Sequence, residues 1–128
     1  MFLFQDTLIF YGVIMPKQYK DEVWVFAKDI KGESPAPGVT RKVLAYCDAA
    51  MCVAHEFEKG AVGSIHSHPN TQITYVAEGR FLFTVGEEVR EVSKGDTLCK
   101  QNGVKHGCEC LEKGVLVDFF TPMRQDFV

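Results

Sequence analysis

The sequence contains no apolar run long enough to cross a bilayer, which takes about 20 consecutive residues in a helix. It also contains no basic stripe interleaved with aromatic residues, and its formal net charge is −3. Both features argue against nucleic acid as a partner. The apolar stretch over residues 1–15 includes Asp6 and has no basic segment, so we do not interpret it as a signal peptide. We therefore expect a cytoplasmic protein that engages neither membranes nor nucleic acid.

A helical hydrophobic period of adequate length is missing as well. From Arg41 onwards the chain instead shows short runs rich in Val, Phe, Tyr and Thr with glycines between them, a pattern typical of strands. The close spacing of these turn signals predicts an antiparallel barrel or sandwich, and 128 residues suit one domain. We expect an all-β single domain over residues 41–128, preceded by an extended N-terminal segment over residues 1–40.

The N-terminal segment has a pattern of its own. Residues 2–10 and 23–27 predict short strands, and the Pro- and Gly-containing stretch 30–40 predicts a loop or an extended linker. The apolar runs 2–4 and 8–10 should not stay exposed to water on so small a barrel. We expect the segment to pack on the barrel or on a second chain, which makes a homodimer the expected assembly.

The cysteine count is odd, and without a secretory signal this predicts reduced thiols. The five cysteines are Cys47, Cys52, Cys99, Cys108 and Cys110. Cys108 and Cys110 lie two apart, but no second pair follows at the spacing of a zinc site. We expect buried thiols in strands.

Three histidines and one glutamine are candidate metal ligands. His66 and His68 lie two apart, so on a strand both imidazoles point to the same face. Gln72 follows at the start of the next predicted strand, and His106 returns from a different part of the sheet. Neutral imidazoles suit Zn, Cu, Fe and Ni, and an amide oxygen can supply a further ligand. Taken alone, the His-x-His pair is equally compatible with hydrogen-bonded surface histidines.

Two neighbouring residues are not expected to take part. Tyr75 has the opposite strand parity to Gln72, so we place it on the outer face and give it no catalytic role. His55 is interpreted as a strand-surface histidine rather than a fifth ligand.

Two motifs resemble those of the cupin superfamily. Segment 60–79 resembles the first motif: a glycine, five residues, His-x-His, a ligand three or four residues later, and a closing glycine. Segment 95–106 resembles the second. Gln72 stands where most cupins have Glu, and Gln101 stands where they usually have Pro. Over residues 41–120 the resemblance implies a jelly-roll-like β-barrel around one divalent transition metal. The implied ligands are His66, His68, Gln72 and His106.

Four stretches resemble, more narrowly, the pectin degradation protein KdgF and its small single-domain relatives: RKVLAY, HEFEKGAVGSIHSHP, QITYVAEGRFLFTVG and VLVDFFTPMRQDFV. That family uses His, His, Gln and His as metal ligands. It converts 4,5-unsaturated uronates, the products of pectate and alginate lyases, to the linear keto form. The resemblance implies catalytic roles for Asp118, Phe120 and Arg124. Residues 98–101 depart from it, because relatives have an aromatic residue and prolines there.

The chemistry of these residues agrees with that activity. Four neutral ligands leave a divalent metal with its full charge, which attracts a small anionic sugar substrate. Arg124 can bind the sugar carboxylate with two parallel N–H donors. Asp118 and Phe120 share one strand face, where the carboxylate can move a proton and the ring can pack on the sugar. By themselves, these residues would instead suggest a surface strand end at Asp118 and a solvated tail at Arg124.

The metal itself is expected to be Ni, Zn, Fe, Mn or Cu. The scaffold also fits two other functions, because one fold hosts many chemistries. One is a metal-dependent dioxygenase. The other is a non-enzymatic cupin that binds or senses a sugar acid.

Overall fold

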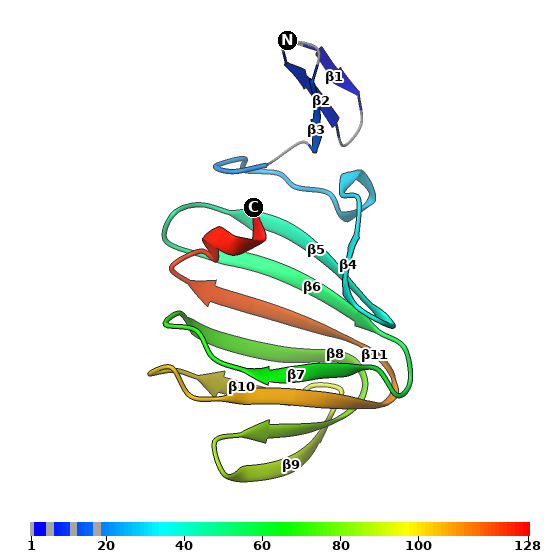
Figure 1. Cartoon of the computed structure of the whole chain (residues 1–128), viewed down its shortest axis with the longest axis vertical. Helices are drawn as coiled ribbons and strands as arrows, with labels where there is room; N and C mark the ends of the chain where they lie inside the picture. Colours follow the sequence, from blue (N-terminus) through cyan, green and yellow to red (C-terminus); the bar gives the residue numbers. More distant parts are fainter. Residues whose placement is uncertain (1, 5–6, 11–12, 17–18) are drawn as a thin grey trace.

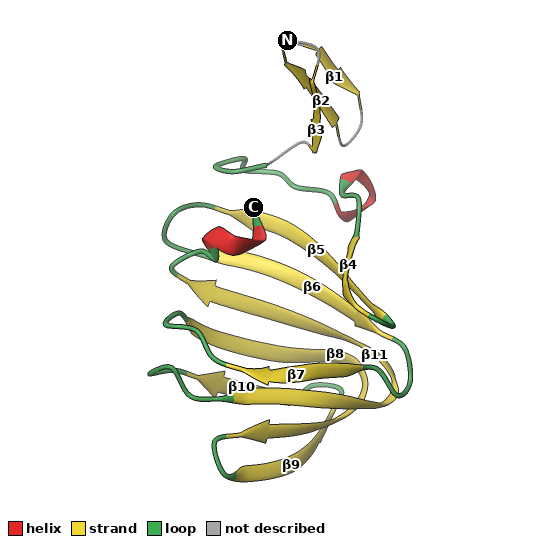
Figure 2. Ribbon diagram, viewed as in Figure 1, coloured by secondary structure: helices red, strands yellow, loops and turns green. Residues whose placement is uncertain are grey.

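The computed structural model describes residues 2–4, 7–10, 13–16 and 19–128, with side chains from Tyr19 onwards (Figures 1 and 2). The strands are β1 (Phe2–Phe4), β2 (Thr7–Phe10), β3 (Val13–Pro16), β4 (Glu33–Ala36), β5 (Val39–Tyr46), β6 (Met51–Phe57), β7 (Val62–His66), β8 (Thr71–Val85), β9 (Glu88–Ser93), β10 (Thr97–Lys100) and β11 (His106–Thr121). Two short 3-10 turns, η1 (Ala27–Asp29) and η2 (Gln125–Phe127), are the helical elements of this part of the chain. The predicted all-β class is confirmed. Among the described residues, no helix has the length and apolar character needed to span a membrane.

The strands form two antiparallel sheets (Figure 1). β1, β2 and β3 make a small sheet, drawn beyond one end of the larger sheet. The larger sheet has eight strands, with the order β10-β8-β11-β6-β5-β4. Its centre is the long pair β8 and β11. In one half of this pair β7 adds to β11 and β9 to β8, and in the other half β6 adds to β11 and β10 to β8. The strands curl into the jelly-roll-like barrel that the sequence predicts.

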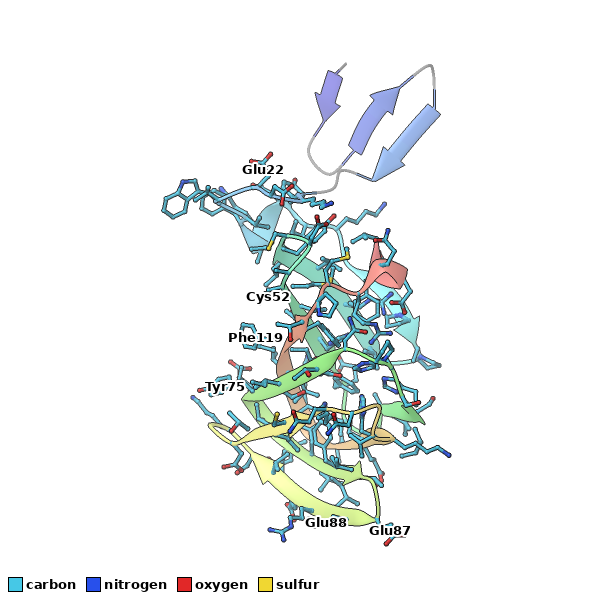
Figure 3. The ribbon with its side chains drawn as sticks, turned by 90° about the vertical axis from the view of Figure 1, so that its left-hand side faces the viewer. Glu22, Cys52, Tyr75, Glu87, Glu88 and Phe119 are labelled. Carbon is cyan, nitrogen blue, oxygen red and sulfur yellow. The ribbon has the colours of Figure 1, made fainter. Side chains whose placement is uncertain are left out.

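The first half of β8 directs polar side chains into the barrel. Gln72, Thr74 and Val76 are buried, whereas Ile73 and Tyr75 between them are exposed. Successive side chains of a strand point to opposite faces, so this alternation turns Gln72 and Thr74 inward. Tyr75 projects from the outer face (Figure 3), as its parity predicts.

The second half of β11 carries the matching inward residues. Asp118 and Phe120 are buried, and Phe119 between them is exposed on the outer face (Figure 3). The register pairs Asp118 with Thr74 and Phe120 with Gln72. Directly opposed residues on one face are in contact distance, so the two strands bring these four side chains together.

The core consists of two apolar clusters. One contains Val39, Phe57, Ala61, Val76, Phe81, Phe83, Cys110 and Leu116. The other contains Tyr46, Met51, Val53 and Phe120. From Tyr19 onwards, six polar residues are also buried: Asn70, Gln72, Thr74, Lys100, His106 and Asp118. Buried polar groups require partners, so this set marks the place to look for a site.

Two glycines allow β8 and β11 to approach closely where their halves meet. Gly79 has a φ of 85°, and a Cβ on it would lie 2.6 Å from the Glu112 carbonyl oxygen and 2.6 Å from the Cα of Gly114. A Cβ on Gly114 would in turn meet the Glu78 carbonyl oxygen. Only glycine fits such a backbone-to-backbone contact, which explains the closing glycine of the first motif.

The N-terminal segment departs in part from the prediction. Residues 23–27 do not form a strand: they lead into η1, and Val23 and Trp24 are exposed. The stretch 30–40 is extended, as predicted, but part of it pairs with β5 as β4. The expected burial of apolar side chains in runs 2–4 and 8–10 lies outside the described side chains. Packing of the segment on the barrel, the domain boundary at residue 40 and the homodimer stay predictions.

The cysteines are free thiols, as predicted. Their expected burial is wrong for Cys47 and Cys99, which are exposed. Cys47 follows the end of β5. Cys99 lies next to Lys100 on β10, and because Lys100 points inward, Cys99 points to the outer face. Cys110 is buried in the larger apolar cluster.

Candidate metal centre

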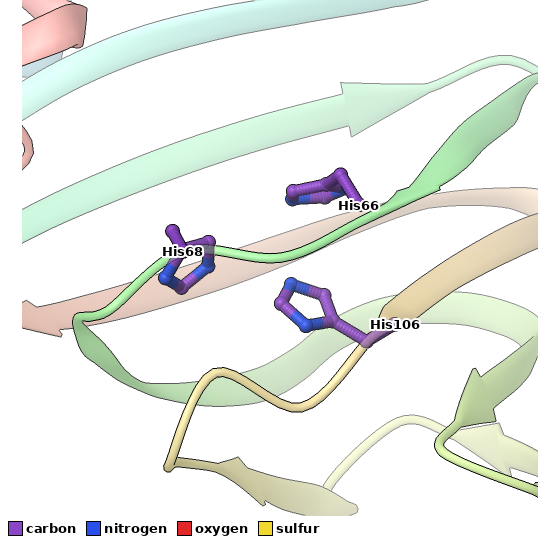
Figure 4. A group of neighbouring side chains, drawn as sticks. All are labelled: His66, His68 and His106. Carbon is purple, nitrogen blue, oxygen red and sulfur yellow. The ribbon is translucent and has the colours of Figure 1, made fainter.

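Three imidazoles gather on the inner face of the barrel (Figure 4). His66 ends β7, His68 lies in the loop that follows, and His106 begins β11 directly opposite His66. The ring centroids lie 4.5 Å apart for His66 and His106, 5.0 Å for His68 and His106, and 5.7 Å for His66 and His68. One ring nitrogen from each lies within 4.8 Å of the others. The structure thus brings together the three predicted histidines.

Backbone carbonyls fix which nitrogen of each ring faces this cluster. The Nδ1 of His66 lies 2.7 Å from the Ser64 carbonyl oxygen, that of His68 lies 3.1 Å from Asn70 O, and that of His106 lies 3.0 Å from Val104 O. A carbonyl oxygen only accepts, so each Nδ1 donates its hydrogen and each Nε2 keeps its lone pair. This is the arrangement by which proteins orient metal-ligating histidines.

Gln72 adds an oxygen to the cluster. Its Oε1 lies 2.8 Å from His68 Nε2, and its Nε2 donates to Asp118 Oδ1 at 2.8 Å. A carboxylate accepts and does not donate, so Asp118 fixes the amide with its nitrogen toward Asp118 and its oxygen toward His68. The predicted fourth ligand is therefore oriented by a buried carboxylate.

These atoms fit a divalent metal. Burial lowers the pKa of His106 to about 4 and also lowers that of His68, so both rings are neutral at pH 7. His106 Nε2 is buried without a hydrogen-bond partner. A neutral His68 cannot donate from both nitrogens, yet its Nε2 faces an oxygen. A cation bound by these lone pairs satisfies both positions, and neutral imidazoles with an amide oxygen form a transition-metal donor set.

Asp118 is the centre of the polar network behind these ligands. Its Oδ1 accepts from Gln72 Nε2 and from the Thr74 hydroxyl, and its Oδ2 lies 2.7 Å from His55 Nδ1. Burial alone would raise the pKa of Asp118. The hydrogen bond and charge of His55, with the Lys100 and Thr74 side chains, lower this pKa to about 2. The predicted inward direction is confirmed, and the carboxylate is ionised although it is buried.

His55 does not lie on the surface, contrary to the prediction. It lies on β6 between the buried residues Val53 and Phe57 of the same face, and its side chain is 14% exposed. The alternation of Met51, Val53 and Phe57 is the sequence signal that places it inside. His55 lies outside the group of three histidines whose ring nitrogens lie close together, and its exclusion from the ligand set stays a prediction.

A pocket of about 360 Å³ opens beside the centre and contains both His66 and His106 in its wall. Phe120 contacts His68 edge to face, with ring centroids 5.6 Å apart. The Arg124 guanidinium lies 5.3 Å from the Phe120 ring and 4.4 Å from the Phe127 ring, and its side chain is 11% exposed. Arg124 is therefore part of the pocket wall and not a solvated tail.

The fork of Arg124 is partly engaged within the chain. Its Nε and Nη2 donate to the Asp126 carboxylate at 2.9 and 2.7 Å. The Asp126 carboxylate therefore occupies one edge of the guanidinium. The sequence did not predict this internal partner, and a role of Arg124 in binding a substrate stays a prediction.

Two other cations in the pocket wall were not predicted. Lys100 is buried at the end of β10, and its Nζ donates to the Thr74 hydroxyl at 2.7 Å. Burial lowers the pKa of this ammonium group. Arg41 on β5 packs 4.0 Å from the Phe127 ring, and its buried Nε has no partner. Charged side chains are rarely buried, so the sequence gives little reason to expect either residue inside. The inward direction of Arg41 is indicated only by its strand parity with Val39, and nothing in the short strand β10 indicates that of Lys100.

Comparison with known proteins agrees with this geometry. Residues 53–120 match the cupin domain family. The chain is 39% identical over 98 residues to the pectin degradation protein KdgF of Dickeya dadantii (strain 3937), which covers 75% of this chain and 89% of that protein. The crystal structure of an RmlC-like cupin from Shewanella frigidimarina NCIMB 400 has a TM-score of 0.82 and 33% identity, over 87% of this chain and 100% of that one. The structure of KdgF from Halomonas sp. has a TM-score of 0.78 and 32% identity, over 82% of this chain and 97% of that one. The resemblance predicted from the two motifs is thereby confirmed, and the chain belongs to the cupin family.

Proposed function

We propose that this cupin is a metal-dependent enzyme of pectin or alginate breakdown that opens 4,5-unsaturated uronates to their linear keto form. One observation carries the proposal: His66, Gln72 and His106, three of the four proposed ligands, line one pocket together with Arg124. A metal held without a carboxylate keeps its full charge, so both parts of the pocket favour an anionic sugar. The similarity to a protein named for pectin degradation supports the substrate class.

Four residues would hold the metal: His66, His68, Gln72 and His106. When bound, a divalent ion supplies Lewis-acid polarisation of substrate oxygens, with no change of oxidation state. Zn, Ni, Fe, Mn and Cu all remain candidates, because imidazole and amide donors do not select among them by type alone.

The chain's own residues bind and orient the sugar. Arg124 offers hydrogen-bond donors to the uronate carboxylate beside the Phe120 and Phe127 rings. Phe120 packs against His68 and presents an apolar surface for one face of the sugar ring. Asp118 supplies the fixed negative charge that a proton transfer in this pocket requires.

The decisive experiment follows the conjugated double bond of the substrate. Protein loaded with each candidate metal is incubated with 4,5-unsaturated galacturonate or mannuronate, and loss of near-ultraviolet absorbance is compared with an enzyme-free control. The expected result is a faster loss that is unchanged when oxygen is removed. A requirement for oxygen would indicate a dioxygenase, and binding without turnover would indicate a sugar-acid sensor. No rate above the control with either uronate would overturn the proposal.

A further inference from the structure

His55 is a pocket residue with no role in holding the metal. It lies on β6 with its ring directed inward, and it lines the same pocket as His66 and His106. Its ring centroid lies 6.4 Å from that of Phe127, the ring on which Arg124 packs at 4.4 Å. His55 and Arg124 therefore both lie near the Phe127 ring in the wall of this pocket.

The hydrogen bond to Asp118 fixes the state of this imidazole. His55 Nδ1 lies 2.7 Å from Asp118 Oδ2, and a carboxylate only accepts, so Nδ1 is the donor. In the neutral imidazole, the lone pair is then on His55 Nε2. The other carboxylate oxygen, Oδ1, is already bonded to Gln72 and Thr74, which leaves Oδ2 to His55. A carboxylate that orients an imidazole in this way also stabilises its protonated form.

Asp118 itself is poorly placed to exchange a proton with a substrate. It is 3% exposed, and both of its oxygens are hydrogen-bonded to side chains of the barrel wall. Three of its about four lone-pair sites are already taken by these donors, so it is a weaker proton acceptor than a free carboxylate. His55 lines the same pocket as this carboxylate, and its side chain is the more exposed of the two, at 14% against 4%.

We infer that His55 Nε2 is the atom that accepts and returns the proton during ring opening, with Asp118 as a positioning residue that acts through it. The inference rests on the proposed function and adds a catalytic residue to it. It also reassigns the proton transfer from the buried carboxylate to the imidazole that the carboxylate holds.

The step balances without a co-reactant. The hemiacetal O–H bond breaks, an N–H bond forms at His55 Nε2, the hydroxyl oxygen becomes a carbonyl, and the ring C–O bond breaks to leave an enolate. The imidazolium then gives its proton to the carbon at position 4, and the enolate becomes a ketone. One proton moves from oxygen to carbon, and no group is oxidised or reduced.

The test compares His55→Ala and His55→Gln with Glu56→Gln, the exposed neighbour on the outer face of β6. Both His55 variants should keep the metal content of the wild-type protein and lose about 100-fold or more in kcat, as expected for removal of a general base. Added imidazole should restore turnover to His55→Ala, whose smaller side chain leaves space for it, and should leave His55→Gln and the control unchanged. A merely structural histidine would show no such rescue.

A second measurement does not depend on activity. In zinc-loaded protein, long-range proton–nitrogen correlation spectra should show His55 with its hydrogen on Nδ1, and Asp118→Asn should change this state. If the wild-type protein is active and His55→Ala is equally active, the inference is overturned and the proposed function is left intact. Metal loss from both His55 variants, or a hydrogen on Nε2 in the wild type, would also overturn it. Absence of wild-type activity would instead refute the proposed function.

Discussion

Exchanging Gln72 for glutamate tests the polar network more sharply than removing a ligand. Most cupins have Glu at this position, so the change is small in the context of the fold. In this chain, however, Gln72 Nε2 donates to Asp118 Oδ1 at 2.8 Å. Gln72→Glu replaces that donor with a second carboxylate oxygen, and in the metal-free protein two carboxylates then face each other inside the barrel.

The cost follows from the distance. Two unit charges 2.8 Å apart repel by about 6 kcal/mol at an effective dielectric constant of 20. Protonating the introduced carboxyl is less costly, because a glutamate of pKa about 4.3 takes up a proton at pH 7 for about 4 kcal/mol. The protonated group then donates to Asp118 as the amide did. We expect Gln72→Glu to lower the free energy of unfolding of the metal-free protein by about 4 kcal/mol at pH 7.

The pH dependence has a defined sign. The introduced carboxyl has a higher pKa in the folded state than in the unfolded state, so stability is lost as pH rises above about 4.3. The deficit relative to wild type should shrink by about 1.4 kcal/mol for each pH unit below 7. Urea unfolding in the presence of a chelator, at several pH values, measures this difference.

A double variant provides the control. In Gln72→Glu/Asp118→Asn the amide and the carboxylate exchange places, so one donor again faces one acceptor at this contact, and most of the deficit of Gln72→Glu should disappear at pH 7. Gln101→Glu adds the same charge at an exposed position and should leave the stability nearly unchanged. A deficit in Gln72→Glu that is independent of pH, or that persists in the double variant, would refute this argument.

Four further outcomes are expected. His68→Ala and His106→Ala should each lose metal by elemental analysis, and full occupancy in both would contradict the site. With metal present, Gln72→Glu should resist chelation better than wild type and bind uronate more weakly, because a carboxylate attracts the cation and cancels one positive charge; equal uronate affinity at matched metal occupancy would count against this. Arg124→Lys should mainly raise KM, since it keeps the charge but loses the fork, whereas a fall in kcat alone would argue against carboxylate binding. Sedimentation should show a dimer, and a monomer with a protease-sensitive N-terminus would exclude it.

The fold and the clustering of the three histidines could be predicted because their signals are local. Alternation along β8 and β11 places Gln72, Asp118 and Phe120 on the inner face. His66 and His106 became neighbours through the motif spacing, which the register of β7 and β11 confirms. His68 differs from the prediction that it shares a strand with His66. It lies in the loop after β7, so the direction of its side chain follows from the turn and not from strand parity.

The remaining pocket residues depend on tertiary context. His55 has the inward parity of its strand, but a histidine is as common outside as inside, so its type did not indicate a direction. Lys100 and Arg41 are cations, and their burial follows from partners on other strands, Thr74 and Phe127. The engagement of Arg124 by Asp126 depends on the turn η2, whose hydrogen bonds carry no recognisable sequence pattern.

The continuity of β8 and β11 has a consequence for how the protein moves. Each strand runs without interruption from the larger apolar cluster, at Phe81 and Cys110, to the polar network at Gln72 and Asp118. Opening the network therefore requires separating the two strands that hold the core, so their amide hydrogens should exchange only with global unfolding. The turn η2, with Arg124 before it and Phe127 within it, is tied to the barrel mainly by side chains. We therefore expect the amide hydrogens of η2 to exchange much faster than those of β8 and β11, because η2 can detach without separating the two long strands.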